Sequence, residues 1–227
     1  MNSKYHFDIE QNTDEWYEIR RNRITASSSK ALLASHLTKT GKVAATSIEF
    51  APGKFLNQGA ITRAKELAAS KLMREREINS WKLAQFDWGH EYEPEAVIEY
   101  ETRTFTKYHP IGFISSNRLG CSPDRINLSL KKGLEVKCPQ KKNHLNYLLN
   151  PKVLYDEYKG QVQFSLMITG WKEWDLISFH PHFDDDCKLA IYKAERDEDM
   201  IKIMREKSAL VLEYSDLLYQ SIKKKVA

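Results

Sequence analysis

The residues of this chain whose types and spacing could do chemistry lie within residues 122–139, which read SPDRINLSLKKGLEVKCP. An acid, Asp124, is followed after ten residues by Glu135 and then by Lys137, with Val136 between them. Side chains alternate along a strand, so Glu135 and Lys137 project together while Val136 faces the core. If the intervening residues form a hairpin turn, Asp124 comes to lie opposite Glu135 on the same face.

Two carboxylates that face each other repel, and each raises the pKa of the other unless a cation lies between them. Mg2+ suits such a pair because it prefers oxygen ligands and is commonly held by one or two carboxylates plus a substrate phosphate. Lys137 could orient or deprotonate a water beside the ion, or stabilise charge that develops on a phosphate. This combination is typical of metal-assisted phosphodiester hydrolysis.

A simpler interpretation is that Asp124 begins an ordinary turn and that Glu135 and Lys137 form an ion pair on the solvent side of a strand. Spacing alone favours this interpretation, because an acid, a gap and a Glu-x-Lys triplet occur by chance in many chains. The small and apolar neighbours in GCSPD and LEVKCP favour the metal site instead, since unpaired carboxylates in such surroundings would be costly.

Hydrophobic periodicity predicts the elements that must position these residues. Helices are predicted from residue 13, after residues 24–29, over residues 60–76, 90–101, 145–154 and 156–169, and from residue 200 onwards. Strands are predicted as a meander of three or four within residues 104–139, and singly over residues 171–180 and 188–193. Residues 37–54 lack a clear period and are predicted to be a loop. Helices around a short mixed sheet define an α/β (α+β) fold.

Composition sets broad limits on the kind of protein. At 227 residues we expect one domain spanning residues 1–227. The 35 basic against 31 acidic residues permit an anionic partner without indicating one. The three cysteines form no C-x-x-C pair, which argues against a disulfide framework or zinc site and favours a reducing cytoplasm. No apolar run approaches the roughly 18 residues of a membrane span, so we expect no membrane association.

The stretch GCSPDRI followed by LEVKCP resembles the PD-(D/E)xK motif of the phage lambda exonuclease-like, or YqaJ-type, family of viral alkaline exonucleases. Three further stretches resemble that family in the same order, namely DEWYEIRRNRITASS, WGHEYEPEA and YKGQVQFSLMITG. Together they span residues 14–170, and an ordered set of this kind is far more specific than any one motif. The resemblance implies a restriction-endonuclease-like core, with a central mixed sheet flanked by helices.

The resemblance also implies a metal site. In the family pattern Glu93, Asp124 and Glu135 are metal-binding carboxylates, and the backbone carbonyl of Val136 is a further ligand. Lys137 corresponds to the catalytic lysine. The implied cofactor is Mg2+, with two ions expected and Mn2+ able to substitute.

Polar residues that line the site and hold the substrate are implied in the same way. Gln161 and Tyr158 correspond to residues that line the catalytic site. Arg20, Ser27 and Ser122 correspond to residues that hold the terminal 5′-phosphate of DNA. An arginine fork with hydroxyl groups suits a dianionic phosphate on physical grounds as well.

Neighbouring residues of the same type compete for two of these assignments. Glu91 and Glu95 flank Glu93, and the Trp-Gly pair at residues 88–89 decides for Glu93. Arg20 competes with the arginines at positions 21 and 23, and its spacing to the ITAS sequence selects it. Gln163 lies two residues from Gln161 and cannot share its helix face, so we favour Gln161.

The implied activity is 5′→3′ digestion of one strand of linear double-stranded DNA that carries 5′-phosphate ends. It would leave a 3′ single-stranded overhang for a single-strand annealing protein during phage-type homologous recombination. The family tends to form a homo-oligomer, a trimeric ring threaded by DNA. The resemblance also implies a location in the cytoplasm of a bacterial host and a phage or prophage gene. Alternatives are a structure- or site-specific endonuclease or repair nuclease of the same fold, and a non-catalytic DNA-binding module.

Three other features have weaker functional interpretations. His180 and His182 with the acids at residues 184–186 could suggest a second metal cluster, but the spacing matches no regular element and we predict a solvated loop. Trp171 and Trp174 are predicted to be core or interface residues rather than base-stacking platforms. Residues 37–60 do not visibly match the family, and a DNA-gripping or duplex-splitting loop could lie there.

Overall fold

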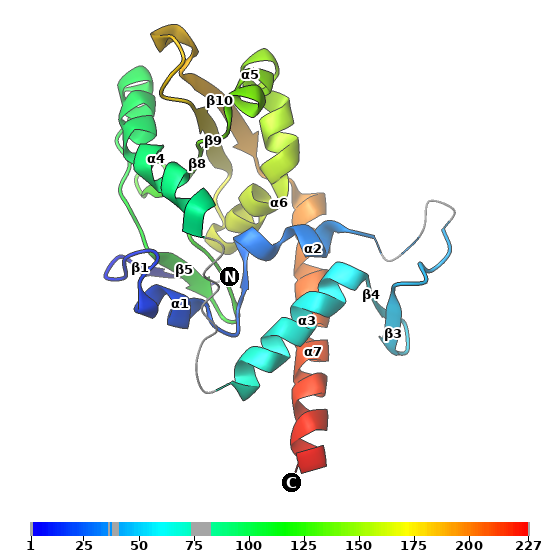
Figure 1. Cartoon of the computed structure of the whole chain (residues 1–227). Coiled ribbons are helices and arrows are strands. Elements are labelled where there is room, and N and C mark those ends of the chain that lie inside the picture. Colours follow the sequence, from blue (N-terminus) through cyan, green and yellow to red (C-terminus); the bar gives the residue numbers. More distant parts are fainter. Residues whose placement is uncertain (1, 36, 38–40, 74–82, 227) are drawn as a thin grey trace.

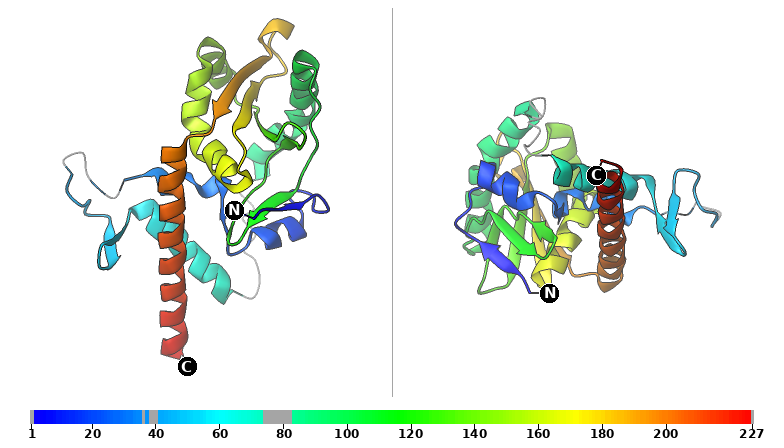
Figure 2. Two further views of the ribbon diagram at one scale, coloured as in Figure 1. Left: turned by 180° about the vertical axis from the view of Figure 1, so that it is seen from behind. Right: turned by 90° about the horizontal axis from the view of Figure 1, so that it is seen from below.

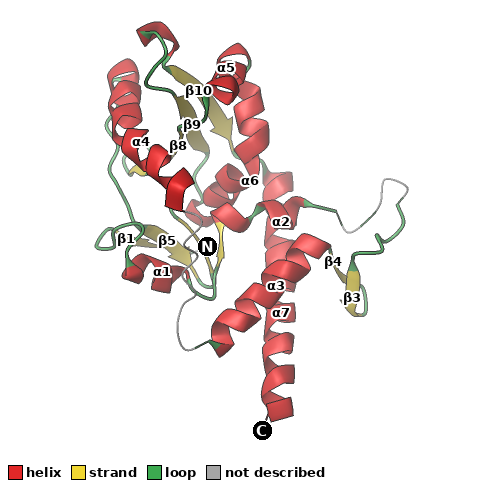
Figure 3. Ribbon diagram, in the orientation of Figure 1, coloured by secondary structure: helices red, strands yellow, loops and turns green. Residues whose placement is uncertain are grey.

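The computed structural model describes residues 2–35, 37, 41–73 and 83–226 of the chain. Within them, helices flank two mixed four-stranded sheets, and a two-stranded hairpin lies to one side (Figure 1, Figure 3). The α/β class expected from the sequence is confirmed. None of the helices in these described ranges combines the length and the apolar character that a membrane crossing requires.

The sheet that carries the candidate acids has the strand order β10-β9-β8-β7. Its strands are β7 (Arg125–Asn127), β8 (Lys132–Lys137), β9 (Glu173–Phe179) and β10 (Leu189–Glu195). Strands β8 and β9 are parallel and the outer pairs are antiparallel. A parallel pair needs a long crossover, and helices α5 (Lys141–Leu149) and α6 (Pro151–Thr169) supply it.

The second sheet has the order β1-β5-β6-β2. It contains β1 (Lys4–His6), β2 (Ile24–Thr25), β5 (Phe113–Ser116) and β6 (Leu119–Cys121). The predicted strands of residues 104–139 are thus four in number, but they are divided between two sheets rather than forming one meander. Residues 122–124 connect the sheets, because β6 ends in one of them and β7 begins in the other.

Helices cover both faces of the sheet β7–β10 (Figure 1, Figure 2). On one face, α4 (Leu83–Thr104) packs Ala96 and Val97 against buried residues of β8 and β9, among them Val136. On the other face α6 is buried along its length, with Phe164 and its apolar neighbours in the larger core. This layering brings α4, β8 and α6 together at one end of the strands. The prediction that Trp171 and Trp174 are core residues is confirmed, since both are buried.

The helix limits follow local capping signals. Helix α1 (Asp14–Arg20) begins where predicted, because the Thr13 side chain accepts a hydrogen bond from the amide of Trp16, 3.3 Å away. The break between α5 and α6 lies at Asn150 rather than at residue 155. Asn150 caps the amide of Lys152 at 3.1 Å, and a proline occupies the favoured first position of α6.

Three further helical segments complete this part of the chain. The 3-10 turn η1 (Ala26–Ser28) leads into the short helix α2 (Lys30–Leu33). Helix α3 (Gln58–Leu72) confirms most of the predicted helix over residues 60–76, whose last residues lie outside the described ranges. The C-terminal helix α7 (Glu198–Val226) packs beside α3 and extends past the sheets (Figure 2).

The loop predicted for residues 37–54 is wrong in its second half. Strands β3 (Ile48–Ala51) and β4 (Lys54–Leu56) form an antiparallel hairpin, and Gly53 takes the left-handed conformation at its turn, with φ +73°. Phe50 packs against Tyr214 of α7 with ring centroids 5.1 Å apart. The hairpin is therefore stabilised by a distant helix, a contact that local sequence does not reveal.

Candidate functional site

The predicted metal-binding acids come from three elements that the fold brings together. In the β7–β8 hairpin Arg125 pairs with Leu134, so the adjoining residues Asp124 and Glu135 lie opposite each other, as predicted. A carboxylate oxygen of Asp124, Oδ2, accepts a hydrogen bond of 2.6 Å from the backbone amide of Val136. That bond joins the residue before β7 to the C-terminal end of β8.

Glu135 and Lys137 form the centre of the site. The Lys137 Nζ lies 2.6 Å from Oε1 of Glu135, and the Gln161 side-chain amide from α6 donates to the same oxygen. The Lys137 Nζ also lies 4.8 Å from the ring centroid of Tyr158, one turn earlier on α6. Glu135 is only 2% exposed, so this is a buried ion pair and not the solvent-side pair of the simpler interpretation. Val136 is buried on the opposite face, as predicted.

The carboxylates in the site affect each other's ionisation. Burial raises the pKa of Glu93 to about 7, and the charge of Asp124 adds to the increase. Burial likewise raises the pKa of Glu135 to about 7, with Asp124 and Glu93 adding to it and Lys137 opposing it. Burial alone would lower the pKa of Lys137, but Glu135 and Asp124 outweigh that effect and raise it. The lysine is therefore protonated at neutral pH, whereas the two glutamates lie near the middle of their titration.

The donor chemistry of this site suits a hard divalent cation. The charge of Asp124 adds to the raised pKa of both Glu93 and Glu135, and a cation between the three carboxylates would relieve this repulsion. Among the described residues, however, no three His, Cys, Asp or Glu side chains are drawn together closely enough to hold a metal ion as they stand. In this arrangement N–H groups of Lys137, Gln161 and Arg125 satisfy the carboxylate oxygens.

A second cluster brings together the three residues predicted to hold a phosphate. The Arg20 guanidinium donates to the hydroxyl of Ser122 at 2.9 Å and to that of Ser27 at 3.2 Å. Trp16 supports it twice, because its indole N–H donates to Ser122 at 2.9 Å and its ring lies 3.9 Å beneath the guanidinium carbon. Burial and the nearby Arg63 lower the pKa of Arg20 to about 10, which leaves it positively charged at neutral pH.

Two residues of the site were missed at the sequence level. Arg125 donates to Oε1 of Glu93 at 2.7 Å and to the backbone carbonyl of Asp124 at 2.5 Å. Trp16 was assigned only to a helix. The only signal for Arg125 in the sequence is its position directly after Asp124. Strand alternation places neighbouring residues on opposite faces and therefore does not select Arg125.

A hollow of about 500 Å³ adjoins the acids. Its lining comes from residues 7–12 of the N-terminal loop and from residues 110–112, which precede β5. Glu93, Asp124 and Arg125 complete the lining.

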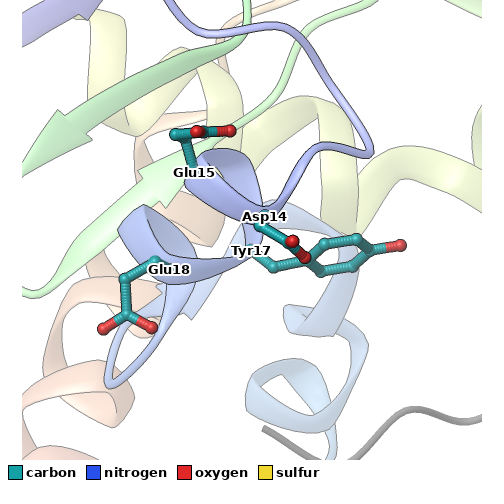
Figure 4. A pocket seen from close by; sticks show the side chains of 4 residues that line it. All are labelled: Asp14, Glu15, Tyr17 and Glu18. Carbon is teal, nitrogen blue, oxygen red and sulfur yellow. The ribbon is translucent and has the colours of Figure 1, made fainter.

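A smaller hollow of about 370 Å³ lies on α1. Figure 4 shows Asp14 and Tyr17 on one side of the helix and Glu18 on another. Its acidic lining would repel a DNA phosphate, and it contains none of the predicted site residues.

The strand predicted to end at residue 180 ends at Phe179, so His180 lies in the loop after β9, but the prediction that this loop is solvated is wrong for His180. Its side chain is buried, with ring centroids 4.9 Å from Phe183, 5.8 Å from His144 and 6.0 Å from Trp88. The acids at residues 184–186 are exposed, as predicted. His180 therefore belongs to an aromatic cluster, and in the described ranges it takes part in no group arranged to hold a metal.

A model of the YqaJ-like viral recombinase domain matches residues 15–172. No curated protein matches the sequence. Among solved structures, an alkaline exonuclease (LHK-Exo) from Laribacter hongkongensis is similar with a TM-score of 0.75 and 25% identity, covering 94% of this chain and 98% of that one. LHK-Exo in complex with dAMP gives a TM-score of 0.73 and 23% identity at the same coverage.

A phage-related exonuclease from Haemophilus somnus 129PT shares the fold, with a TM-score of 0.69 and 14% identity over 88% of this chain and 96% of that one. The family model covers the phosphate cluster, the three carboxylates, the lysine and the glutamine, all of which lie between residues 15 and 172. Because that match extends over more than half of the sequence, the chain belongs to the YqaJ-like viral recombinase family.

Proposed function

We propose that this protein is a Mg2+-dependent exonuclease that digests the 5′-ended strand of linear double-stranded DNA and leaves a 3′ overhang. Family membership and the exonuclease neighbours support a phage-type nuclease. The observation that carries the finer proposal is the adjacency of the two clusters. Ser122, which binds Arg20, and Asp124, which belongs to the acid cluster, are separated by one proline.

The acid cluster is the proposed metal site. Glu93, Asp124 and Glu135, with the backbone carbonyl of Val136, would hold Mg2+, with two ions expected and Mn2+ as a substitute. When bound, the metal supplies a Lewis acid for the phosphate and lowers the pKa of a coordinated water. To bind it, the carboxylates must exchange hydrogen bonds from N–H groups for contacts with the cation.

Lys137 serves in this proposal as a fixed positive charge. Glu135 and Asp124 raise its pKa in the metal-free site, so it is protonated there, and as a cation it can donate a hydrogen bond to an oxygen of the scissile phosphate. Gln161 holds the orientation of Glu135 through their hydrogen bond. Tyr158 lies beside the lysine amine and limits the directions in which it can point.

The Arg20 cluster is the proposed site for the terminal 5′-phosphate. The guanidinium fork and the hydroxyls of Ser27 and Ser122 offer several donors to a dianion, and charge-assisted bonds of this kind are stronger than neutral ones. The Trp16 ring lies beneath the guanidinium and fixes the orientation of its plane. A phosphate held there would set the distance from the DNA end to the bond that is cut.

The wider assembly follows the family resemblance. We propose a single domain over residues 1–227, a homo-oligomer such as a trimeric ring that encloses DNA, and a single-strand annealing protein as the recipient of the 3′ strand. The setting would be the cytoplasm of a bacterial host that carries the phage or prophage gene.

Covalently closed and linear DNA distinguish this proposal from its nearest rival, a structure- or site-specific endonuclease. Linear duplex should be digested in Mg2+ and left intact in EDTA, while closed circular duplex of the same sequence stays intact in both. Nicking of the circle would favour the endonuclease, and binding of linear duplex without Mg2+-dependent release of nucleotides would favour a DNA-binding module.

A further inference from the structure

A buried polar cluster lies on the α4 face of the sheet and is centred on Asp175 of β9. Asp175 is 0% exposed, and its Oδ2 accepts hydrogen bonds from the hydroxyls of Tyr100 and, at 3.3 Å, Tyr108. Lys132 Nζ lies 3.0 Å from the same oxygen. We name these four residues the Asp175 cluster. A buried carboxylate is costly, and Oδ1 has no hydrogen-bond partner among the described residues, so stability alone is a weak reason for it.

The hydrogen bond from Tyr100 to Asp175 sets the position of α4. Tyr100 follows Glu93 by seven residues, which is about two helical turns and places both side chains on one face about 10 Å apart along the axis. Ala96 and Val97, between them, are buried against the sheet. A bond from Tyr100 to β9 therefore fixes the rotation and the axial position of the helix that carries Glu93.

The other two side chains of the cluster, Lys132 and Tyr108, connect Asp175 to the strands beside the remaining acids. Lys132 is the first residue of β8, which carries Glu135. Tyr108 adjoins His109, whose backbone exchanges two hydrogen bonds of 2.8 Å with Ile126 of β7, two residues after Asp124. Each element that bears a proposed metal ligand is thus attached to the same buried carboxylate.

We propose that the Asp175 cluster is a positioning device that fixes the backbone segments carrying Glu93, Asp124 and Glu135 relative to one another, so that the three side chains can turn onto a divalent cation. The inference rests on the proposed function, because it concerns the same three carboxylates. None of its members would touch the cation or the DNA. Burial, and then the bond to Asp175, raise the pKa of Tyr100, so its hydroxyl stays a hydrogen-bond donor at every pH at which the protein would work.

The test uses Mn2+ alone as the probe, with its affinity for the full chain measured by electron paramagnetic resonance in the absence of DNA. Tyr100→Phe removes one hydroxyl and keeps the ring that packs in the core. We expect Mn2+ affinity to fall about tenfold, the lower range for loss of a group that orients metal ligands. Tyr155→Phe is the matched control, because that hydroxyl accepts a bond of 3.0 Å from Gln163 on the β10 side of α6.

The control separates positioning from stability. Tyr100→Phe should lose more thermal stability than Tyr155→Phe, since its bond reaches a buried carboxylate and the other joins two neutral, part-buried groups. Mn2+ affinity is therefore measured well below both melting temperatures, where only Tyr100→Phe should bind the ion more weakly. In a Glu93→Gln background the same substitution should change affinity by less than twofold, because the group it positions has been removed. If Tyr100→Phe does not fold, Tyr108→Phe replaces it, with about a threefold loss expected for its longer bond.

Wild-type affinity retained in Tyr100→Phe, or an equal loss in Tyr155→Phe, would overturn the inference. If the wild-type protein digests linear DNA and binds Mn2+ but the substitution has no effect, only the inference fails. If the wild-type protein neither binds Mn2+ nor digests DNA, the proposed function fails and the inference with it.

Discussion

The two halves of the candidate site meet at residues 122–124, where one proline separates Ser122 from Asp124, and they have opposite electrostatic character. The Arg20 cluster joins a positive guanidinium to hydroxyls, one of them on the exposed Ser27. The acid cluster buries Glu135 and raises the pKa of two glutamates. In the proposed function, a DNA phosphate is attracted to the first half and repelled by the second until a cation binds. The difference implies that recognition of a DNA end and cleavage can be impaired separately.

The halves also differ in how they are built. Trp16, Arg20 and Ser27 lie within twelve residues of one another, and only Ser122 comes from a distant part of the chain. The acid cluster needs α4, β7, β8 and α6 together. Changes in the packing of α4 should therefore affect metal binding more than recognition of the 5′-phosphate.

The largest effect is expected for Lys137→Ala. Loss of the charge beside Glu135 should lower the rate of digestion about 100- to 1000-fold on every kind of DNA end, since removal of one preorganised electrostatic donor costs about 10² to 10³ in rate. The rate of nucleotide release at saturating Mg2+ measures it, and the far-ultraviolet circular dichroism spectrum checks the fold. A folded variant with full activity would remove Lys137 from the mechanism.

Arg20→Gln should affect only one kind of end. Removal of charge-assisted hydrogen bonds should slow digestion from 5′-phosphate ends about 10- to 100-fold and leave 5′-hydroxyl ends at the wild-type rate. The matched control is Arg21→Gln, whose guanidinium donates to the backbone of α3 and to Glu18 rather than to the serines. A variant that still prefers phosphorylated ends by the wild-type ratio would show that Arg20 has another role.

Acid pH should weaken metal binding in the acid cluster only. Because Glu93 and Glu135 titrate near pH 7, Mg2+ must displace a proton from each below that pH, and its affinity should be about a hundredfold lower at pH 6 than at pH 8, about tenfold for each glutamate. Calorimetric titration at the two pH values measures the change. Equal affinity at both would contradict the raised pKa values.

The stability of the metal-free protein should change in the opposite direction. The folded pKa of Glu135 is raised above its ordinary value of 4.5, so the folded form binds the proton more tightly. Its contribution is complete below about pH 4.5 and is lost as the pH rises through about 7. Glu135→Gln should therefore flatten the fall in melting temperature between pH 5 and pH 8, and Mg2+ should restore stability at pH 8 in the wild type alone.

The smallest effect is expected for Ser27→Ala. Ser27 is exposed and its bond to Arg20 is 3.2 Å long, so its loss should slow digestion from phosphorylated ends about three- to fivefold. The comparison of phosphorylated and unphosphorylated ends serves again as the measurement. A loss as large as that of Arg20→Gln would mean that Ser27, and not the arginine, dominates recognition of the phosphate.

Local patterns were sufficient where a structure depends on neighbours in sequence. Thr13 marked the start of α1, and alternation in LEVK placed Glu135 and Lys137 on one face with Val136 on the other. Local patterns failed where contacts between residues far apart in sequence determine the structure. The β3–β4 hairpin rests on Tyr214, and the division of the predicted meander into two sheets depends on pairing with strands far away in sequence.

The candidate site shows the same division. Its acids and serines could be named from motif resemblance, and the structure brings them together, whereas their roles stay predictions. Arg125 and Asp175 carried no comparable signal. Asp175 lies in a stretch that reads only as a strand, and its burial with Tyr100 becomes visible only when α4 is packed on the sheet.

The most direct test of the account follows both strands of one linear duplex in Mg2+. The duplex carries a phosphate at one 5′ end and a hydroxyl at the other, with a distinct fluorescent label within each strand. We predict that the phosphorylated strand shortens from its 5′ end at least about tenfold faster than the hydroxyl-ended strand shortens from its own 5′ end. Shortening from a 3′ end, or internal cuts in either strand, would contradict it.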